Sequence, residues 1–206
     1  MKRRVPYSTM SVLALGILCG LGWVGCAKPG DVHLAPLNDA HRAVETGMTA
    51  LASWNVDSVK AARARVGERL KDLDWLVADT TLTFAVADGQ LIGDWNRVKR
   101  FLKDGPERLT ALAKEGEVCL TQIDNLAAAI RSEATMDAEG TPMDEAYFSK
   151  AAARELELVA QWKAAVEETE RLVSSGLELE AATRASLDSL ILVKRAEWAQ
   201  HIADSE

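Results

Sequence analysis

Two histidine–carboxylate pairs are the residues of this sequence whose spacing could bind a metal. His41 lies four residues before Glu45, and His201 lies four residues after Glu197. If their helices packed side by side, the pairs could face one another as four metal ligands. Di-iron bundles, however, use a Glu-x-x-His spacing of three, and a spacing of four is also that of a surface ion pair. We therefore expect solvated ion pairs and no metal or other cofactor, with a metal-binding or small-ligand-binding bundle as the alternative.

No pattern typical of an enzyme accompanies these residues. The sequence lacks a Gly-x-Ser-x-Gly motif, and its glycines are scattered and form no phosphate-binding loop. Cys119 has no histidine near it in the sequence, and its place on an apolar stripe predicts a buried thiol that behaves as a small apolar side chain. We expect a protein that is not an enzyme.

The first 26 residues carry a different chemical signal. Residues 2–4 are basic, and residues 12–21 form an apolar run, which is shorter than the roughly 20 residues that span a bilayer. The run is followed by Gly25 and Cys26, so the segment has the parts of an export signal. It resembles the lipobox-type signal peptide of bacterial lipoproteins, although Trp23 stands where the lipobox usually has leucine.

This resemblance implies that residues 1–25 are removed and that Cys26 becomes the acylated first residue, with palmitate among its acyl chains. More than one acyl chain would anchor the protein stably. The implied location is the bacterial cell envelope, at the outer membrane on its periplasmic side, with residues 26–36 as a lipidated tether. The only partner implied directly is the membrane, through this lipid anchor.

Charge limits the classes of partner. The full chain carries a net charge of −7, and removal of the signal with its three basic residues would make this −10. An acidic chain of this kind is not expected to bind nucleic acid or anionic lipid headgroups. The remaining possibilities are an envelope protein or a second copy of the chain.

Apolar residues recur every three or four positions along the rest of the chain, which predicts helices. We expect the first helix to begin at Leu37, capped by Asn38, and the second to be capped by Asp57. Because the stripe of the second helix stays in phase through residues 80–86, we expect that segment to be helical, with a bend or an end at Asp88-Gly89.

Gly105-Pro106 predicts a break and a new helix. This helix has the most regular stripe, a heptad pattern typical of a helix-bundle seam: Leu109, Leu112, Gly116, Cys119, Ile123, Leu126 and Ile130. A polar linker near 132–141 follows, and Thr141-Pro142 predicts the next helix start. Whether helices over 142–175 and 177–203 are continuous across Ser174–Gly176 is left open.

Two further groups of residues suggest contacts. Trp75 lies off the main stripe, and we expect it to cover a neighbouring helix, the alternative being an exposed contact point for a partner. Four basic residues lie before Gly105: Arg97, Lys99, Arg100 and Lys103. They suit a helix C-terminus, and a docking patch for an acidic partner is the alternative.

Together these patterns predict an all-α fold. We expect residues 37–206 to form a single domain of four to six helices, either an antiparallel bundle or an elongated coiled-coil-like hairpin. The expected function is that of a small helical envelope lipoprotein with a non-catalytic interaction or structural role.

Overall fold

The computed structural model describes residues 28–205 of the chain. This part contains five α-helices and no β-strand, which confirms the predicted all-α helical bundle. The helices are α1 (Asp31–Ala52), α2 (Val56–Ala78), α3 (Val86–Leu102), α4 (Gly105–Arg131) and α5 (Glu145–Ala203).

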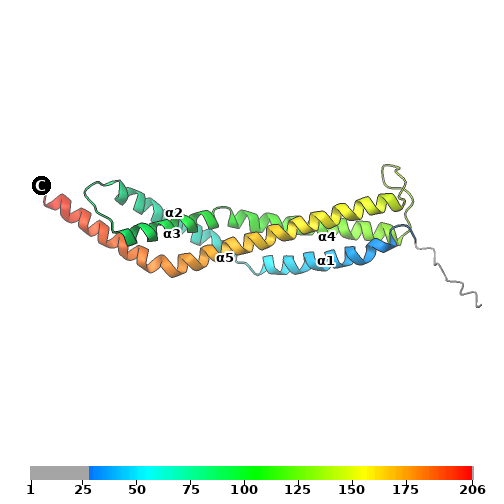
Figure 1. Ribbon diagram of the computed structural model, residues 1–206, viewed down its shortest axis with the longest axis horizontal. Coiled ribbons are helices and arrows are strands. Elements are labelled where there is room, and N and C mark those ends of the chain that lie inside the picture. The colour runs from blue at the N-terminus through cyan, green and yellow to red at the C-terminus, as the bar shows by residue number, and fades with distance from the viewer. Residues whose placement is uncertain (1–27, 206) are drawn as a thin grey trace, which may run out of the picture.

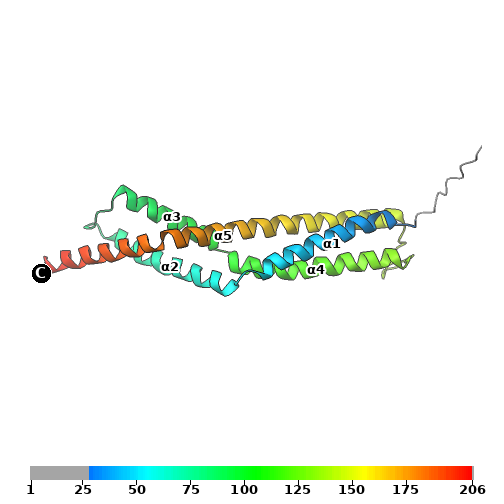
Figure 2. The same ribbon diagram turned by 90° about the horizontal axis from the view of Figure 1, so that it is seen from below.

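The five helices form a long rod made of three columns of helix (Figure 1). Helices α1 and α2 follow one another in the first column, α3 and α4 return as the second, and α5 runs the whole length as the third (Figures 1 and 2). We call α1, α4 and the beginning of α5 the proximal half, and α2, α3 and the end of α5 the distal half. Each half is a three-helix bundle in which every helix packs against the other two. With 59 residues in α5, the rod is about 88 Å long.

Helix α1 begins earlier than the sequence indicated. Its first residue is Asp31, so the predicted tether is wrong for residues 31–36, and Asn38 lies inside the helix. Gly30 holds this start against the bundle, because its N–H donates to Glu145 Oε2 at 2.7 Å. Gly30 also has a φ of +83°, a conformation that glycine adopts without strain, and it packs against the side chain of Phe148.

Helix α2 ends earlier than predicted. Its N-cap is Asn55, whose side chain accepts from the N–H of Ser58, so the predicted Asp57 cap is wrong. The helix stops at Ala78. Of the segment 80–86 that we expected to be helical, residues 80–85 form a loop, and Val86 is the first residue of α3. Asp79 explains the stop, because its carboxylate accepts both the N–H and the hydroxyl of Thr81, at 2.8 and 2.6 Å. Such local side-chain bonds compete with helical hydrogen bonding.

The start of α3 also differs from the prediction. Asp88 and Gly89 lie in the first turn of this helix, where the sequence had indicated a bend or an end. The reason is the carboxylate of Asp88, which accepts the N–H of Ala85 at 2.8 Å and so satisfies a backbone donor at the helix start.

Helices α4 and α5 mostly follow the sequence. The predicted break at Gly105-Pro106 is confirmed, and the heptad stripe of α4 is buried except for Leu126, which is half-buried. Helix α5 starts later than predicted, because Asp144 and not Thr141 provides the N-cap, accepting the N–H of Tyr147 at 2.9 Å. The helix then passes through Ser174–Gly176 without interruption, which answers the question that the sequence left open.

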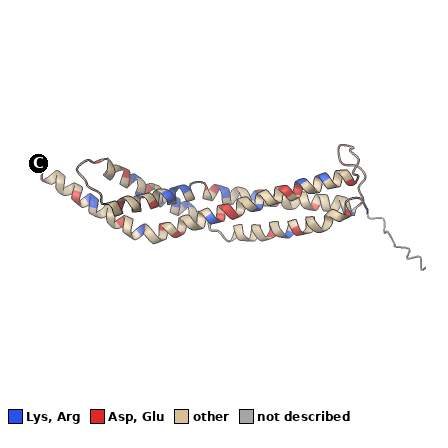
Figure 3. Ribbon diagram, viewed as in Figure 1, with Lys and Arg blue, Asp and Glu red and all other residues tan. Residues whose placement is uncertain are grey.

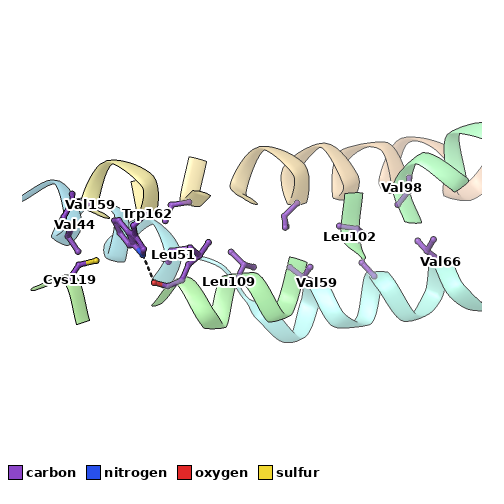
Figure 4. Packing of buried hydrophobic residues seen from close by; sticks show 14 of the residues in the cluster. Val44, Leu51, Val59, Val66, Val98, Leu102, Leu109, Cys119, Val159 and Trp162 are labelled. Atoms are coloured by element: carbon purple, nitrogen blue, oxygen red, sulfur yellow. Dashed lines mark hydrogen bonds between the residues drawn. The ribbon is translucent and has the colours of Figure 1, made fainter. Parts of the chain in front are cut away.

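The core of the proximal half is organised around Trp162 of α5 (Figure 4). The indole lies against two glycines, Gly47 of α1 and Gly116 of α4. A Cβ at either position would come within 2.6 and 2.9 Å of its ring. The indole Nε1 donates to the carbonyl of Leu112 at 2.9 Å. The two glycines therefore let three helix backbones close around one large side chain, and Trp162 is a core residue.

Near the middle of the rod, Gly176 allows a similar close approach. A Cβ at Gly176 would lie 2.6 Å from Leu102 Cδ2 and 3.1 Å from the Cβ of Phe101. We expect Gly176→Ala to lower the free energy of unfolding by about 1–3 kcal/mol, the usual cost of overpacking. Gly67→Ala is the matched control, because nothing lies within 4 Å of the added Cβ in α2. There alanine should stabilise by up to about 1 kcal/mol. Chemical denaturation of both variants checks this, and an equal change in the two would contradict it.

Candidate functional site

The two histidine pairs are not brought together. His41 lies in the proximal half, where its ring nitrogens are 3.5 Å from Glu45 Oε2 and 3.4 Å from Asp124 Oδ1. Glu197 pairs with Lys194 at 2.8 Å near the other end of the rod, and His201 lies in the last turn of α5. The four residues therefore form no common site. Between residues 28 and 205, no cluster of three or more His, Cys, Asp or Glu side chains is arranged to bind a metal.

Cys119 is buried on the seam of α4, as predicted. Burial is the main cause that raises the pKa of its thiol, and the nearby carboxylates of Glu155 and Glu115 raise the pKa further. The thiol form is therefore favoured over the reactive thiolate.

The predicted signal peptide and Cys26 lie outside the described residues, so the lipidation of Cys26 stays a prediction. Within the described residues, no helix has both the length and the apolar character needed to cross a membrane. The first described residue, Lys28, forms an ion pair with Glu133 in the loop at the proximal end.

The distal part of α5 carries an exposed stripe with no charged residue. Seven residues separated by three and four positions alternately share one face, and all seven are exposed. We call them the distal stripe: Ala182, Ala185, Ser189, Leu192, Ala196, Ala199 and Ala203. Leu192 is their largest side chain and is 71% exposed. No other helix in the described part of the chain covers this face.

The same face changes character along α5. Eight earlier positions of α5 are in phase with the distal stripe, and five of them are charged. The eight are Arg154, Glu157, Gln161, Ala164, Glu168, Arg171, Ser175 and Glu178. That is the composition of a solvated helix surface. Beyond Glu178 no charge occurs on the face for the rest of the helix, and the distal part of α5 is mostly uncharged in Figure 3.

The charged residues of distal α5 point to neighbouring residues of the same bundle and leave the stripe uncharged. Asp188 lies 2.7 Å from Arg69 of α2, and Arg195 lies 2.7 Å from Asp72 of the same helix. Lys194 is buried and lies over the ring of Phe84, with its Nζ 5.4 Å from the ring centroid. These pairs fix the distal end of α5 on α2 and on the 79–85 loop.

An open groove flanks the stripe on each side. The groove between α3 and α5 includes Leu91, Leu190 and Val193. The groove between α2 and α5 is lined by Trp75 and Trp198, whose rings pack edge to face at 4.9 Å. Trp75 therefore covers α5, as expected, but it remains 49% exposed and also fits the alternative of a contact residue.

The predicted basic cluster lies at the end of α3, near the middle of the rod (Figure 3). Arg97 is 3.3 Å from Asp94 of its own helix, while Lys99 and Arg100 are in the last turn, where positive charge interacts favourably with the helix dipole. This supports the helix-terminus interpretation of the cluster.

The distal stripe was not predicted from the sequence. Its spacing was visible in the sequence, but alanine and serine add little to an apolar pattern. Comparison of the chain with known protein families, curated proteins and solved structures gives no match.

Proposed function

We propose that the protein is a lipid-anchored, non-catalytic rod of the bacterial cell envelope. Its N-terminal end would be held at the membrane by acylated Cys26, at the outer membrane on its periplasmic side. Its distal half would present an interaction surface to an envelope protein or to another copy of the chain. The surface consists of the distal stripe and the two grooves beside it.

The observation that carries this proposal is the separation of the two ends. Lys28, two residues after Cys26, lies at the proximal end, and the distal stripe occupies the opposite end of α5. An anchor at Cys26 would therefore leave the apolar surface far from the attachment point. Contiguous exposed apolar surface is a feature of protein interaction sites.

Cys26→Ala tests the anchor. In a bacterial host, we expect the full wild-type chain to fractionate with membranes and the variant to appear in the soluble fraction, because acyl chains supply the membrane affinity. Cross-linking in cells, followed by affinity capture and mass spectrometry, should recover species with the wild type that are lost with the variant.

Cys119→Ala is the matched control, because this cysteine is buried in the bundle and its loss should leave fractionation unchanged. If Cys26→Ala stayed in the membrane fraction with the same cross-linked species, the anchored-rod proposal would be wrong.

A further inference from the structure

An open, apolar groove lies between α4 and α5 in the proximal half. Its volume is about 570 Å³, which is within the range of small-ligand sites. The buried residues Cys119 and Trp162 line its base, and Val118 and Leu158 on its two sides are 54% and 36% exposed. We call it the proximal groove.

We infer that the proximal groove holds an acyl chain of Cys26 of the same molecule when the protein is away from a bilayer. This inference rests on the proposed function, because the acyl chain is the membrane anchor proposed there. It gives that anchor a second position, on the protein itself, where it is sheltered from water.

The lining of the groove fits an alkyl chain. Its two charged lining residues, Lys114 and Glu115, are adjacent and opposite in sign, so they supply no net charge for an ionic headgroup. The other lining residues are apolar or are glutamines. The indole N–H of Trp162 already donates to the carbonyl of Leu112, which leaves the base of the groove apolar. Such a surface stabilises each CH₂ group that it removes from water.

An uncharged path joins the groove to the proximal end of the rod. From Val118 the same face of α4 continues in alternating steps of four and three. The next four positions on it are Gln122, Asn125, Ala129 and Ser132. Glu133, directly after Ser132, is the ion-pair partner of Lys28. The path therefore begins where the N-terminal segment meets the bundle.

The length of the anchor matches this path. Cys26 is two residues before Lys28, so their Cα atoms are within about 7 Å of one another. From Val118 to the end of α4 at Arg131 is about 20 Å of helix. An extended palmitoyl chain is about 19 Å long, given its C–C bonds of about 1.5 Å. An acyl chain that starts beside Glu133 can therefore follow the path as far as Val118.

Attachment to the same chain favours this occupant over a free lipid, because the link gives the acyl chain a high effective concentration at the groove. A bilayer surrounds an acyl chain on all sides, whereas the groove is open along one side. The acyl chain should therefore leave the groove when a bilayer is present.

A photoreactive anchor identifies the occupant. A bacterial host expressing the full wild-type chain is grown with a palmitate analogue that carries a diazirine near its methyl end. The purified protein is freed of detergent and irradiated at high dilution, and the monomer band is digested for mass spectrometry. We expect the acyl group to be cross-linked within the same chain to residues 114–122 or 158–165. Acylated Cys26 with all its cross-links outside these ranges would overturn the inference.

Adding phosphatidylcholine vesicles before irradiation tests the exchange with a bilayer. Cross-links to the groove should then decrease, because the acyl chain moves into the vesicles. If their yield is the same with and without vesicles, the acyl chain does not move between groove and bilayer, and the inference is wrong on this point.

A pair of matched variants tests the groove. Val118→Asp places a carboxylate in it, and Val77→Asp does the same in α2, away from it. The two valines are similarly exposed, at 54% and 53%. We expect Val118→Asp to reduce the cross-links to the groove by about 10-fold or more, because the acyl chain would have to desolvate the new charge. Val77→Asp should leave them unchanged, and an equal effect of both variants would contradict the inference. Circular dichroism and thermal unfolding check that both variants keep the fold.

The same measurements separate this inference from the proposed function. If mass spectrometry finds no acyl group on Cys26, the proposed anchor is wrong, and this inference fails with it. If Cys26 is acylated and Cys26→Ala leaves the membrane fraction, but the acyl cross-links lie outside the groove, the anchored rod remains and only this inference is wrong.

Discussion

Trp162→Ala is expected to lower the free energy of unfolding by about 3–5 kcal/mol, the usual cost of removing a large aromatic side chain from a core. Trp162 is only 4% exposed, and its ring fills the space between Gly47 and Gly116. The two facing glycines have no side chain that can fill the cavity, and Met48 of α1, which lies beside Gly116, is the flexible neighbour that can fill part of it. Denaturant unfolding followed by circular dichroism measures the loss.

A double-mutant cycle identifies the cause. In the wild-type background, Gly47→Ala should be destabilising, because its Cβ would lie 2.6 Å from the Trp162 ring. In the Trp162→Ala background that clash is absent, and the same substitution should be neutral or stabilising, since alanine favours a helix. Additive effects would contradict the proposed packing of these residues.

The second large effect concerns a buried carboxylate in the distal half. The side chain of Glu180 is 2% exposed. It accepts hydrogen bonds from Arg184 of its own helix, at 2.8 Å, and from Arg65 of α2, at 3.3 Å. Replacing both arginines with methionine would leave this charge buried without a partner. We expect a loss of about 3–5 kcal/mol at pH 7, as found when a buried ion pair loses one side.

The contribution of Glu180 to stability should change with pH in opposite directions in the wild type and in the variant that lacks both arginines. Burial pushes the pKa of Glu180 upward, but the hydrogen bonds and charges of Arg184 and Arg65 outweigh it, so the pKa lies below its ordinary value. In the wild type, the carboxylate therefore contributes stability above its unfolded pKa of about 4.3, and this contribution is lost as pH falls through the lower folded pKa.

In the Arg65→Met/Arg184→Met variant only burial remains, so the folded pKa should lie above the unfolded one. Its stability deficit relative to the wild type should then shrink as pH falls through that raised value. Adding Glu180→Gln is the matched control, because it removes the titrating group and should abolish this pH-dependent difference. A deficit that is constant with pH would show that lost packing, and not the buried charge, causes the effect.

The sequence predicted correctly those features of the fold that residues close together in the chain determine. The heptad stripe of α4 and the Gly105-Pro106 break are examples, because both depend on residues close to one another in sequence. The continuity of α5 was undecided from sequence, because Gly176 resembles a helix end when read alone. In the structure it is a contact point for Leu102 of α3, a residue 74 positions away.

The errors at α1 and α2 have the same origin. Gly30 begins α1 through contacts with Glu145 and Phe148 of α5, which no local pattern reveals. The end of α2 depends on a competition between helical hydrogen bonding and the local bonds that Asp79 accepts from the N–H and the hydroxyl of Thr81. For the candidate site, the spacing of the distal stripe was present in the sequence, but its exposure depended on how α2 and α3 pack around α5.

The unbroken course of α5 has a mechanical consequence. The other two columns pass from one helix to the next at nearly the same level, at residues 53–55 and 103–104. Gly105 lies at this level, between Val173 of α5 and Val59 of α2. A rod in which all three columns of helix were interrupted at one level would bend there. Here the continuous helix α5 crosses that level and resists bending. The molecule should therefore behave as a spacer of fixed length, able to transmit force between its two ends.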